Sequence, residues 1–189
     1  GTSEKKEERH AEDKKHDKGQ VLVTGGTGYV GAWCVHELLQ SGHMVSTTVR
    51  DPHGPKAEFL RKLVASGANL KIHKADLLEG DEVWQPLMAG VEIVLHVASP
   101  FPLMPPKKKM EHLIVDPAVK GTRVVLENAM KAGVKRIVLT SSIVAISEPQ
   151  QKGKVYTPAD WSSLKGAFPY QKSKILAEQK AWELAKQYP

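Results

Sequence analysis

The sequence has little of what several protein classes require. Its only cysteine is Cys34, which excludes an internal disulfide and a metal site built from a cysteine cluster. A single thiol suits a reducing compartment, so we expect a cytoplasmic protein. No apolar run approaches the roughly 20 residues needed to span a bilayer, and residues 1–19 lack the apolar stretch of a signal peptide. We therefore expect neither a membrane segment nor a metal site.

The excess of positive charge lies in the body of the chain. The net charge is +6, but basic and acidic side chains balance one another in residues 1–19, which we expect to form a disordered charged tail. The densest basic run, Lys107–Lys109, is typical of a solvated loop. Nothing resembles a nucleic-acid module with interleaved aromatic residues, so we expect no nucleic-acid partner. A basic face also suits a protein that attracts a phosphorylated cofactor.

From Gln20 onward, apolar runs alternate with amphipathic stretches. Short buried runs predict five strands, over Gln20–Thr24, Met44–Val49, Leu70–Lys74, Val91–Val97 and Arg136–Ser141. Helical spacing predicts helices over Tyr29–Gln40, Lys56–Ala65, Asp81–Met88, about Lys109 to Lys131, and Tyr170–Gln187. Strands that are separated by helices imply crossovers and a parallel sheet covered on both faces. The prediction is one α/β domain over residues 20–189 with a doubly wound parallel sheet.

Three glycines mark the turn between the first strand and the first helix. Gly25, Gly28 and Gly31 have the spacing G-x-x-G-x-x-G within Thr24–Gly31. Glycine permits a tight turn and lets the backbone approach a pyrophosphate, while the helix N-terminus offers N–H groups to the anion. The spacing predicts a dinucleotide site at this turn, and a Walker-type loop is excluded because no Gly-Lys-Ser/Thr follows. The residues of the turn that we expect at the cofactor are Gly25, Thr27, Gly28, Tyr29, Val30 and Gly31.

The residues after the next strands predict which dinucleotide binds. Arg50 ends the second strand and Lys56 follows; a guanidinium pairs well with a 2′-phosphate, which favours NADP. Asp51 is an alternative contact, to the ribose, as in NAD-preferring sites. Asp76, with Leu77, is placed to accept a hydrogen bond from the adenine amino group or to cap the next helix.

The loop that leaves the fourth strand should also lie beside the cofactor. Its predicted contacts are Val97, Ala98 and Ser99, because the carboxyl end of that strand meets the cofactor edge of the sheet. His96 is predicted to be a packed residue and not a catalytic one.

The last helix opens with a tyrosine and a lysine on one face. Tyr170 and Lys174 are four residues apart, so their side chains can reach one site. A tyrosine hydroxyl has a pKa of about 10, and a nearby ammonium favours the phenolate. The pair can therefore act as a general acid toward a carbonyl oxygen, and Lys174 can also bond the nicotinamide ribose. Ser142, after the fifth strand, is the candidate to hold the substrate oxygen, with Ser141 supporting the loop.

Taken together, these motifs resemble the extended short-chain dehydrogenase/reductases, in particular the dihydroflavonol reductase and cinnamoyl-CoA reductase branch. The resemblance covers essentially all of residues 20–189. It is carried by Thr24–Gly31, Val49–Pro52, Lys74–Leu77, His96–Pro100, Val115–Thr122, Val138–Ser142, Tyr170–Lys174 and Ala177-Glu178. It implies a Rossmann fold and an NADPH-dependent reductase of a small-molecule carbonyl, with Ser142, Tyr170 and Lys174 as a triad. The oligomeric state is not predicted.

Two departures limit what the resemblance implies. Ile143–Ser147 lacks the asparagine that many dihydroflavonol reductases place there, and Gly166–Pro169 differs from the Asn-Trp-Tyr-Cys signature of cinnamoyl-CoA reductases. A general aldehyde or ketone is therefore the expected substrate. Relatives also add a C-terminal substrate domain, so we expect a chain truncated before that domain, with its fifth strand at a sheet edge. The alternatives are a truncated non-catalytic NADP-binding module or pseudoenzyme, and, within the same family, epimerisation or hydroxysteroid oxidation.

Overall fold

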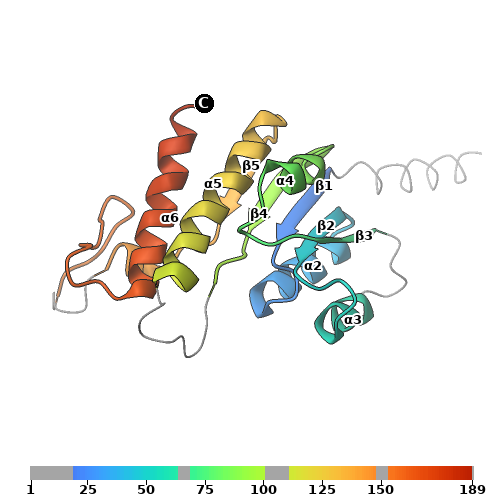
Figure 1. Ribbon diagram of the computed structural model, residues 1–189, viewed down its shortest axis with the longest axis horizontal. Helices are drawn as coiled ribbons and strands as arrows, with labels where there is room; N and C mark the ends of the chain where they lie inside the picture. Colours follow the sequence, from blue (N-terminus) through green and yellow to red (C-terminus); the bar gives the residue numbers. More distant parts are fainter. Residues whose placement is uncertain (1–18, 64–68, 101–110, 148–152, 189) are drawn as a thin grey trace, which may run out of the picture.

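Five parallel strands form one sheet in the computed structural model, which describes residues 19–63, 69–100, 111–147 and 153–188 (Figure 1). The predicted tail and Lys107–Lys109 lie outside the described residues, apart from Gly19. The strands are β1 (Gln20–Thr24), β2 (Met44–Val49), β3 (Leu70–Lys74), β4 (Val91–His96) and β5 (Arg136–Leu139). Their order is β3-β2-β1-β4-β5, so the predicted α/β doubly wound parallel sheet is confirmed.

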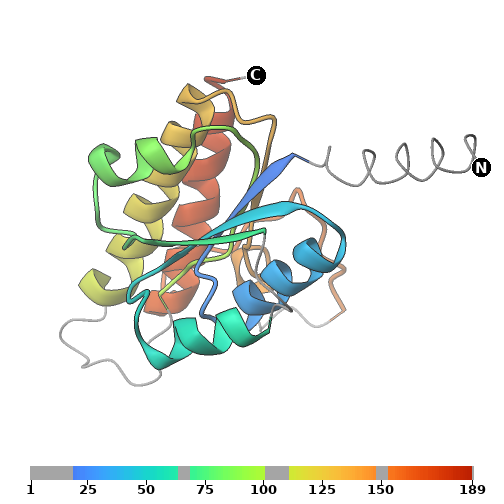
Figure 2. The same ribbon diagram turned by 90° about the vertical axis from the view of Figure 1, so that its right-hand side faces the viewer.

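Helices cover both faces of the sheet, as Figures 1 and 2 show. The helices are α2 (Tyr29–Gln40), α3 (Pro55–Lys62), α4 (Asp81–Leu87), α5 (Asp116–Lys131) and α6 (Pro169–Ala185). One core cluster joins β1 and β2 to α2 and α3 through Val21, Val45, Val35 and Leu60. Because side chains alternate along a strand, Leu22 of β1 points to the other face, into the core of α4, α5 and α6. Among the described residues, no helix is both long and apolar enough to cross a membrane.

The element bounds differ from the predicted ones mainly at the entry to α5. A π-helical turn, Glu111–Val115, precedes α5 where a continuous helix is predicted from about Lys109. Pro117 explains part of the difference, because it has no N–H to donate to the preceding turn. The fifth strand ends at Leu139, two residues before the predicted end. Ser142 instead begins a short 3₁₀ helix, η3 (Ile143–Ala145).

The strand order places the carboxyl ends of β1 and β4 side by side at the switch point of the sheet. From β1 the chain moves outward to β2 and β3, then returns to β4 and β5 on the other side. In open α/β sheets, the crevice at this reversal is where ligands bind. Among the strands that the structure describes, β5 lies at an edge of the sheet as predicted, and its Val138 is 47% exposed.

Candidate cofactor and proton-transfer site

The turn after β1 is shaped by glycine. Gly25 has φ = 74°, a conformation that side chains disfavour, and Gly25 and Gly26 both donate to the Thr48 carbonyl at 3.1 Å. A Cβ added at Gly31 would lie 2.2 Å from the Gly25 carbonyl oxygen. These two positions therefore require glycine for the turn itself and for the close approach of α2 to β1, as the spacing predicts.

The amino end of α2 fits an anion. Gly28 is the N-cap residue and supplies no side-chain cap, and the first turn of the helix holds no acidic residue. The first N–H groups of a helix have no partner within it, and the helix dipole makes this end positive. The side chains of Tyr29 and Val30 are exposed beside it. A pyrophosphate suits this end, although the contacts predicted for Thr27, Gly28, Tyr29 and Val30 remain predictions.

A groove of about 550 Å³ runs between α2 and α3. It brings together Thr27, Gly28, Tyr29 and Lys56, four residues that the sequence predicts at the cofactor. The rest of its wall is mainly apolar, with Trp33, Phe59 and Leu60 among the lining residues. The glycine turn and the start of α3 therefore border one groove.

Arg50 is exposed at the end of β2, with Lys56 exposed in the first turn of α3. Asp51, the alternative ribose contact, accepts a hydrogen bond from the His53 N–H at 3.0 Å. One oxygen of this carboxylate is thus already used by the turn, which favours Arg50 as the residue available to a ligand.

Asp76 lies after β3 and shapes the loop that it begins. Its Oδ1 accepts from the Leu78 N–H at 3.0 Å, forming a local turn. The alternative role of helix cap is wrong, because α4 has Gly80 as its N-cap and no side-chain cap. Leu77 packs against α5, where a Cβ on Gly121 would meet it. The adenine contact of Asp76 and Leu77 remains a prediction.

A buried hydrogen-bond cluster joins β1 to the loop after β4. The Thr24 hydroxyl accepts from the Ala98 N–H at 3.0 Å and lies 2.9 Å from His96 Nδ1. Burial, with a smaller contribution from the Lys174 charge, lowers the His96 pKa to about 4. His96 is a neutral packed residue, as predicted, and it helps place the loop of Val97, Ala98 and Ser99.

The proton-transfer candidates gather where β5 meets α6. Lys174 is buried, and its Nζ donates to the Thr140 carbonyl at 3.0 Å and lies 6.0 Å from the centre of the Tyr170 ring. Burial lowers the pKa of Lys174. Ser142 caps η3, where its Oγ accepts from the Val144 N–H at 3.4 Å. The structure therefore pairs Tyr170 with Lys174 and places Ser142 two residues after the carbonyl that Lys174 bonds.

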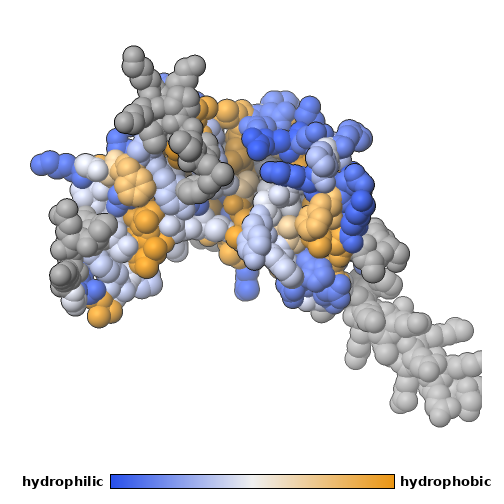
Figure 3. Space-filling model, turned by 90° about the horizontal axis from the view of Figure 1, so that it is seen from below, coloured by the Kyte–Doolittle hydropathy of each residue, from blue (hydrophilic) through white to orange (hydrophobic). Residues whose placement is uncertain are grey.

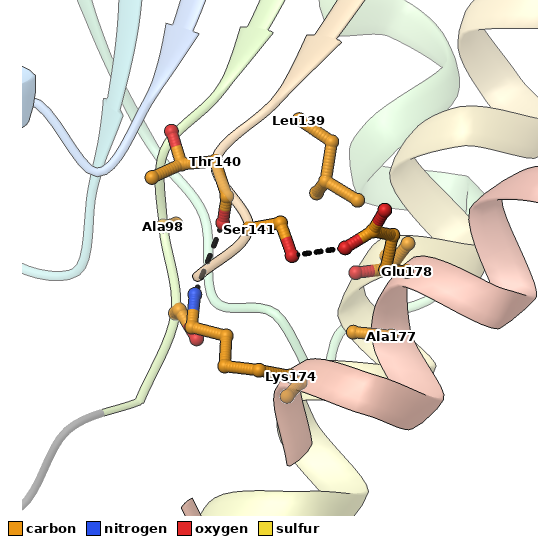
Figure 4. Close-up of a pocket in the computed structure, with 10 residues that line it drawn as sticks. Ala98, Leu139, Thr140, Ser141, Lys174, Ala177 and Glu178 are labelled. Carbon is orange, nitrogen blue, oxygen red and sulfur yellow. Dashed lines mark hydrogen bonds between the residues drawn. The ribbon is translucent and has the colours of Figure 1, made fainter. Parts of the chain in front are cut away.

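A small pocket lies beside these residues (Figure 4). Its lining includes Ser99, Ser141, Lys174 and Glu178, whereas Ser142 and Tyr170 are not among the lining residues. The Ser141 hydroxyl donates to Glu178 Oε2, so Ser141 ties the loop to α6. In the part of the chain that the structure describes, no group of three or more His, Cys, Asp or Glu residues could hold a metal ion.

Comparison with known proteins identifies the family. Residues 21–189 match the model of the NAD dependent epimerase/dehydratase family. The chain belongs to this family. It is 39% identical over 177 residues to cinnamoyl-CoA reductase CAD2 of Medicago truncatula, covering 88% of this chain and 53% of that protein. It is also 36% identical over 178 residues to dihydroflavonol 4-reductase of Hordeum vulgare, covering 89% and 49%. The resemblance to the extended short-chain dehydrogenase/reductases is confirmed.

Solved structures of reductases have the same fold as this chain. Yeast methylglyoxal/isovaleraldehyde reductase Gre2, in complex with NADPH, matches with a TM-score of 0.78 at 28% identity, over 89% of this chain and 53% of that one. Vestitone reductase from alfalfa (Medicago sativa) matches with a TM-score of 0.73 at 30% identity, over 90% and 54%. The chain spans about half the length of the relatives that it matches.

Three residues of this extended short-chain dehydrogenase/reductase site are not among the predicted site residues. Thr24 and Thr140 contribute through hydrogen bonds to residues far away in the sequence, which no sequence spacing reveals. Glu178 did carry a signal, because it lies four residues after Lys174 and hence on the same face of α6.

Proposed function

We propose that this chain forms the cofactor-binding and proton-transfer part of an NADPH-dependent oxidoreductase that reduces an aldehyde or ketone to an alcohol. One observation carries the proposal: Lys174, Tyr170 and the loop of Ser142 lie close together at the carboxyl edge of the sheet. The glycine turn lies at the same edge. The NADPH complex of the structurally similar Gre2 supports the cofactor. The activity of the whole protein is part of the proposal, because the chain spans about half the length of its relatives.

The residues of this edge fit the dinucleotide in three places. The uncapped amino end of α2 suits the pyrophosphate, and exposed Arg50 suits a 2′-phosphate. The loop of Val97, Ala98 and Ser99 would lie beside the nicotinamide half, held there by Thr24. When bound, NADPH supplies the hydride that the carbonyl carbon receives.

Tyr170, Lys174 and Ser142 would provide the proton and bind the substrate oxygen. The Tyr170 hydroxyl donates its proton to the carbonyl oxygen, which leaves a phenolate. The Lys174 ammonium stabilises that phenolate; in a buried position this attraction is stronger than in water. The Ser142 hydroxyl accepts from the Val144 N–H and still has a proton with which to hold the same carbonyl oxygen.

The proposed substrate is an aldehyde or ketone with an apolar part. Figure 3 views the molecule from the carboxyl edge of the sheet, where apolar patches interrupt a mainly polar surface. Ile143 directly follows Ser142 and is 71% exposed, and Phe168, two residues before Tyr170, is 53% exposed. Exposed apolar side chains close in sequence to Ser142 and to Tyr170 suit such a substrate.

Replacing Tyr170 with Phe tests the proposal. The variant keeps the ring but has no proton to donate, so we expect kcat for aldehyde reduction to fall by about 100-fold or more. The Kd for NADPH, measured by fluorescence, should change by less than about twofold. Tyr188→Phe, beyond the end of α6, is the matched control and should leave both quantities unchanged. Retained turnover in Tyr170→Phe would show that another group is the acid.

A second candidate function is NADPH binding without carbonyl reduction. It is supported by the pocket beside Lys174, because neither Ser142 nor Tyr170 is among the residues that line it. The two candidates separate in one experiment with a panel of aldehydes and ketones. Saturable NADPH binding without turnover of any of them selects the second candidate, and measurable turnover selects the first.

A further inference from the structure

Two adjacent residues after β5 are held by two side chains one turn apart on α6. Lys174 Nζ donates to the carbonyl of Thr140, and the hydroxyl of Ser141 donates to Glu178 Oε2 (Figure 4). Lys174 and Glu178 are four residues apart, so both lie on the face of α6 that meets the loop. The loop that carries Ser142 is thus fastened at two successive positions to the helix that carries Tyr170.

The Glu178 carboxylate is itself fixed in orientation. Its Oε2 accepts from Ser141, and its Oε1 accepts from Trp182 Nε1 at 3.3 Å. A carboxylate that is bonded through both oxygens has little rotational freedom. Hydrogen bonds to an ionised acceptor are also about twice as strong as those between neutral groups. Glu178 is therefore a rigid anchor for Ser141.

We propose that Glu178 is a positioning residue for the reduction: by holding Ser141, it sets where Ser142 lies relative to Tyr170 and Lys174. Ser142 has an extended backbone (φ −155°, ψ 149°), and in extended chain successive side chains point to opposite sides. When Ser141 turns toward Glu178, Ser142 is directed away from it. This inference rests on the proposed function, because Ser142 has a role only if a carbonyl oxygen is bound there.

Kinetics of four variants test the positioning role. We expect Glu178→Ala to lower kcat for aldehyde reduction by about 10- to 100-fold, the loss typical of a misplaced reacting group, with the NADPH Kd unchanged within about twofold. Ser141→Ala should lower kcat by a similar factor. The double variant should lower kcat no more than the worse single variant does, because both substitutions break the same contact. Glu178→Gln keeps an acceptor for Trp182 and an amide for Ser141, so it should restore kcat to within about threefold of the unmodified protein.

The control is Glu183→Ala, which removes an exposed carboxylate of the same helix that pairs with Lys180. It should leave kcat unchanged. Losses that add in the double variant, or an unchanged kcat in Glu178→Ala, would overturn the proposal. An equal loss of NADPH affinity would also overturn it, because that result indicates a general role in folding.

Amide hydrogen exchange tests the anchoring of the loop by Glu178 independently of the proposed function, because the measurement does not need catalytic activity. Exchange of the amides of residues 142–147 should be faster in Glu178→Ala than in the unmodified protein, and unchanged in Glu183→Ala and Glu178→Gln. If the unmodified protein reduces no carbonyl, the proposed function fails while the exchange rates still support or overturn the anchoring of the loop by Glu178.

Discussion

At the scale of single residues, His96 should make the free energy of unfolding depend on pH. The histidine is 2% exposed and bonded to the Thr24 hydroxyl, and its pKa in the folded protein is about 4, below the ordinary 6.5. Between these two values, the unfolded chain binds a proton that the folded chain does not. The free energy of unfolding should therefore fall as the pH is lowered from about 6.5 to about 4, by up to about 1.4 kcal/mol per pH unit from this group.

Urea unfolding at a series of pH values, with His96→Gln for comparison, measures this dependence. The variant should be less stable at pH 7, because the Thr24 contact is altered, but its stability should depend less steeply on pH. His73 also has a lowered pKa, caused by partial burial and then by the charge of Lys71. His73→Gln should therefore reduce the slope as well, by a smaller amount. Equal slopes in the His96→Gln and unmodified proteins would contradict the assignment.

At the scale of elements, the packing of α2 against β1 depends on Gly31. In Gly31→Ala the new Cβ would lie 2.2 Å from the Gly25 carbonyl oxygen, so helix and turn must separate. We expect a loss of about 1–3 kcal/mol in the free energy of unfolding, as in other overpacked sites, together with weaker NADPH binding. Urea unfolding and a fluorescence titration with NADPH measure the two effects.

Gly133→Ala is the matched control for the packing effect. Gly133 has φ = 74°, but an added Cβ there meets no atom within 4 Å. Its substitution should cost about 1–2 kcal/mol through backbone conformation alone and leave the NADPH Kd unchanged. If Gly31→Ala binds NADPH as tightly as the control does, NADPH binding at the turn does not depend on the close approach of α2.

Elements whose signal is local could be predicted from the sequence, and contacts between distant residues could not. The bounds of β1, β2, β3 and α2 are confirmed as predicted, because a buried run or a helical period is complete within each. The entry to α5 and the end of β5 are set instead by Pro117 and by the cap that Ser142 gives η3. The spacing of Tyr170 and Lys174 on one helix predicts that their side chains lie close together, and Lys174 Nζ lies 6.0 Å from the centre of the Tyr170 ring. The contact of Lys174 with Thr140 depends on how α6 packs against the sheet, which no periodicity encodes.

At the scale of the whole molecule, cofactor preference should appear as a difference in thermal stability. A ligand that binds only the folded chain stabilises it by RT ln(1 + [L]/Kd), so at equal concentrations the tighter cofactor raises Tm more. Arg50 and Lys56 are exposed after the carboxyl end of β2, in a chain with net charge +6, and the 2′-phosphate gives NADPH more negative charge than NADH. We expect NADPH to raise Tm more than NADH does.

Arg50→Gln should reduce the difference in Tm between the NADPH and NADH complexes, mainly because the variant binds NADPH more weakly. A charge-assisted pair is worth about 1.5–3 kcal/mol, so the Kd for NADPH should rise by about tenfold or more while that for NADH changes little. Arg136→Gln is the control: Arg136 is also exposed, but it begins β5 and so lies at the opposite edge of the sheet. Removing one positive charge there should leave the preference intact. Equal loss of preference in both variants would mean that the net charge of the molecule attracts NADPH, and an unchanged preference in Arg50→Gln would assign the 2′-phosphate to another residue, with Lys56 the first to test.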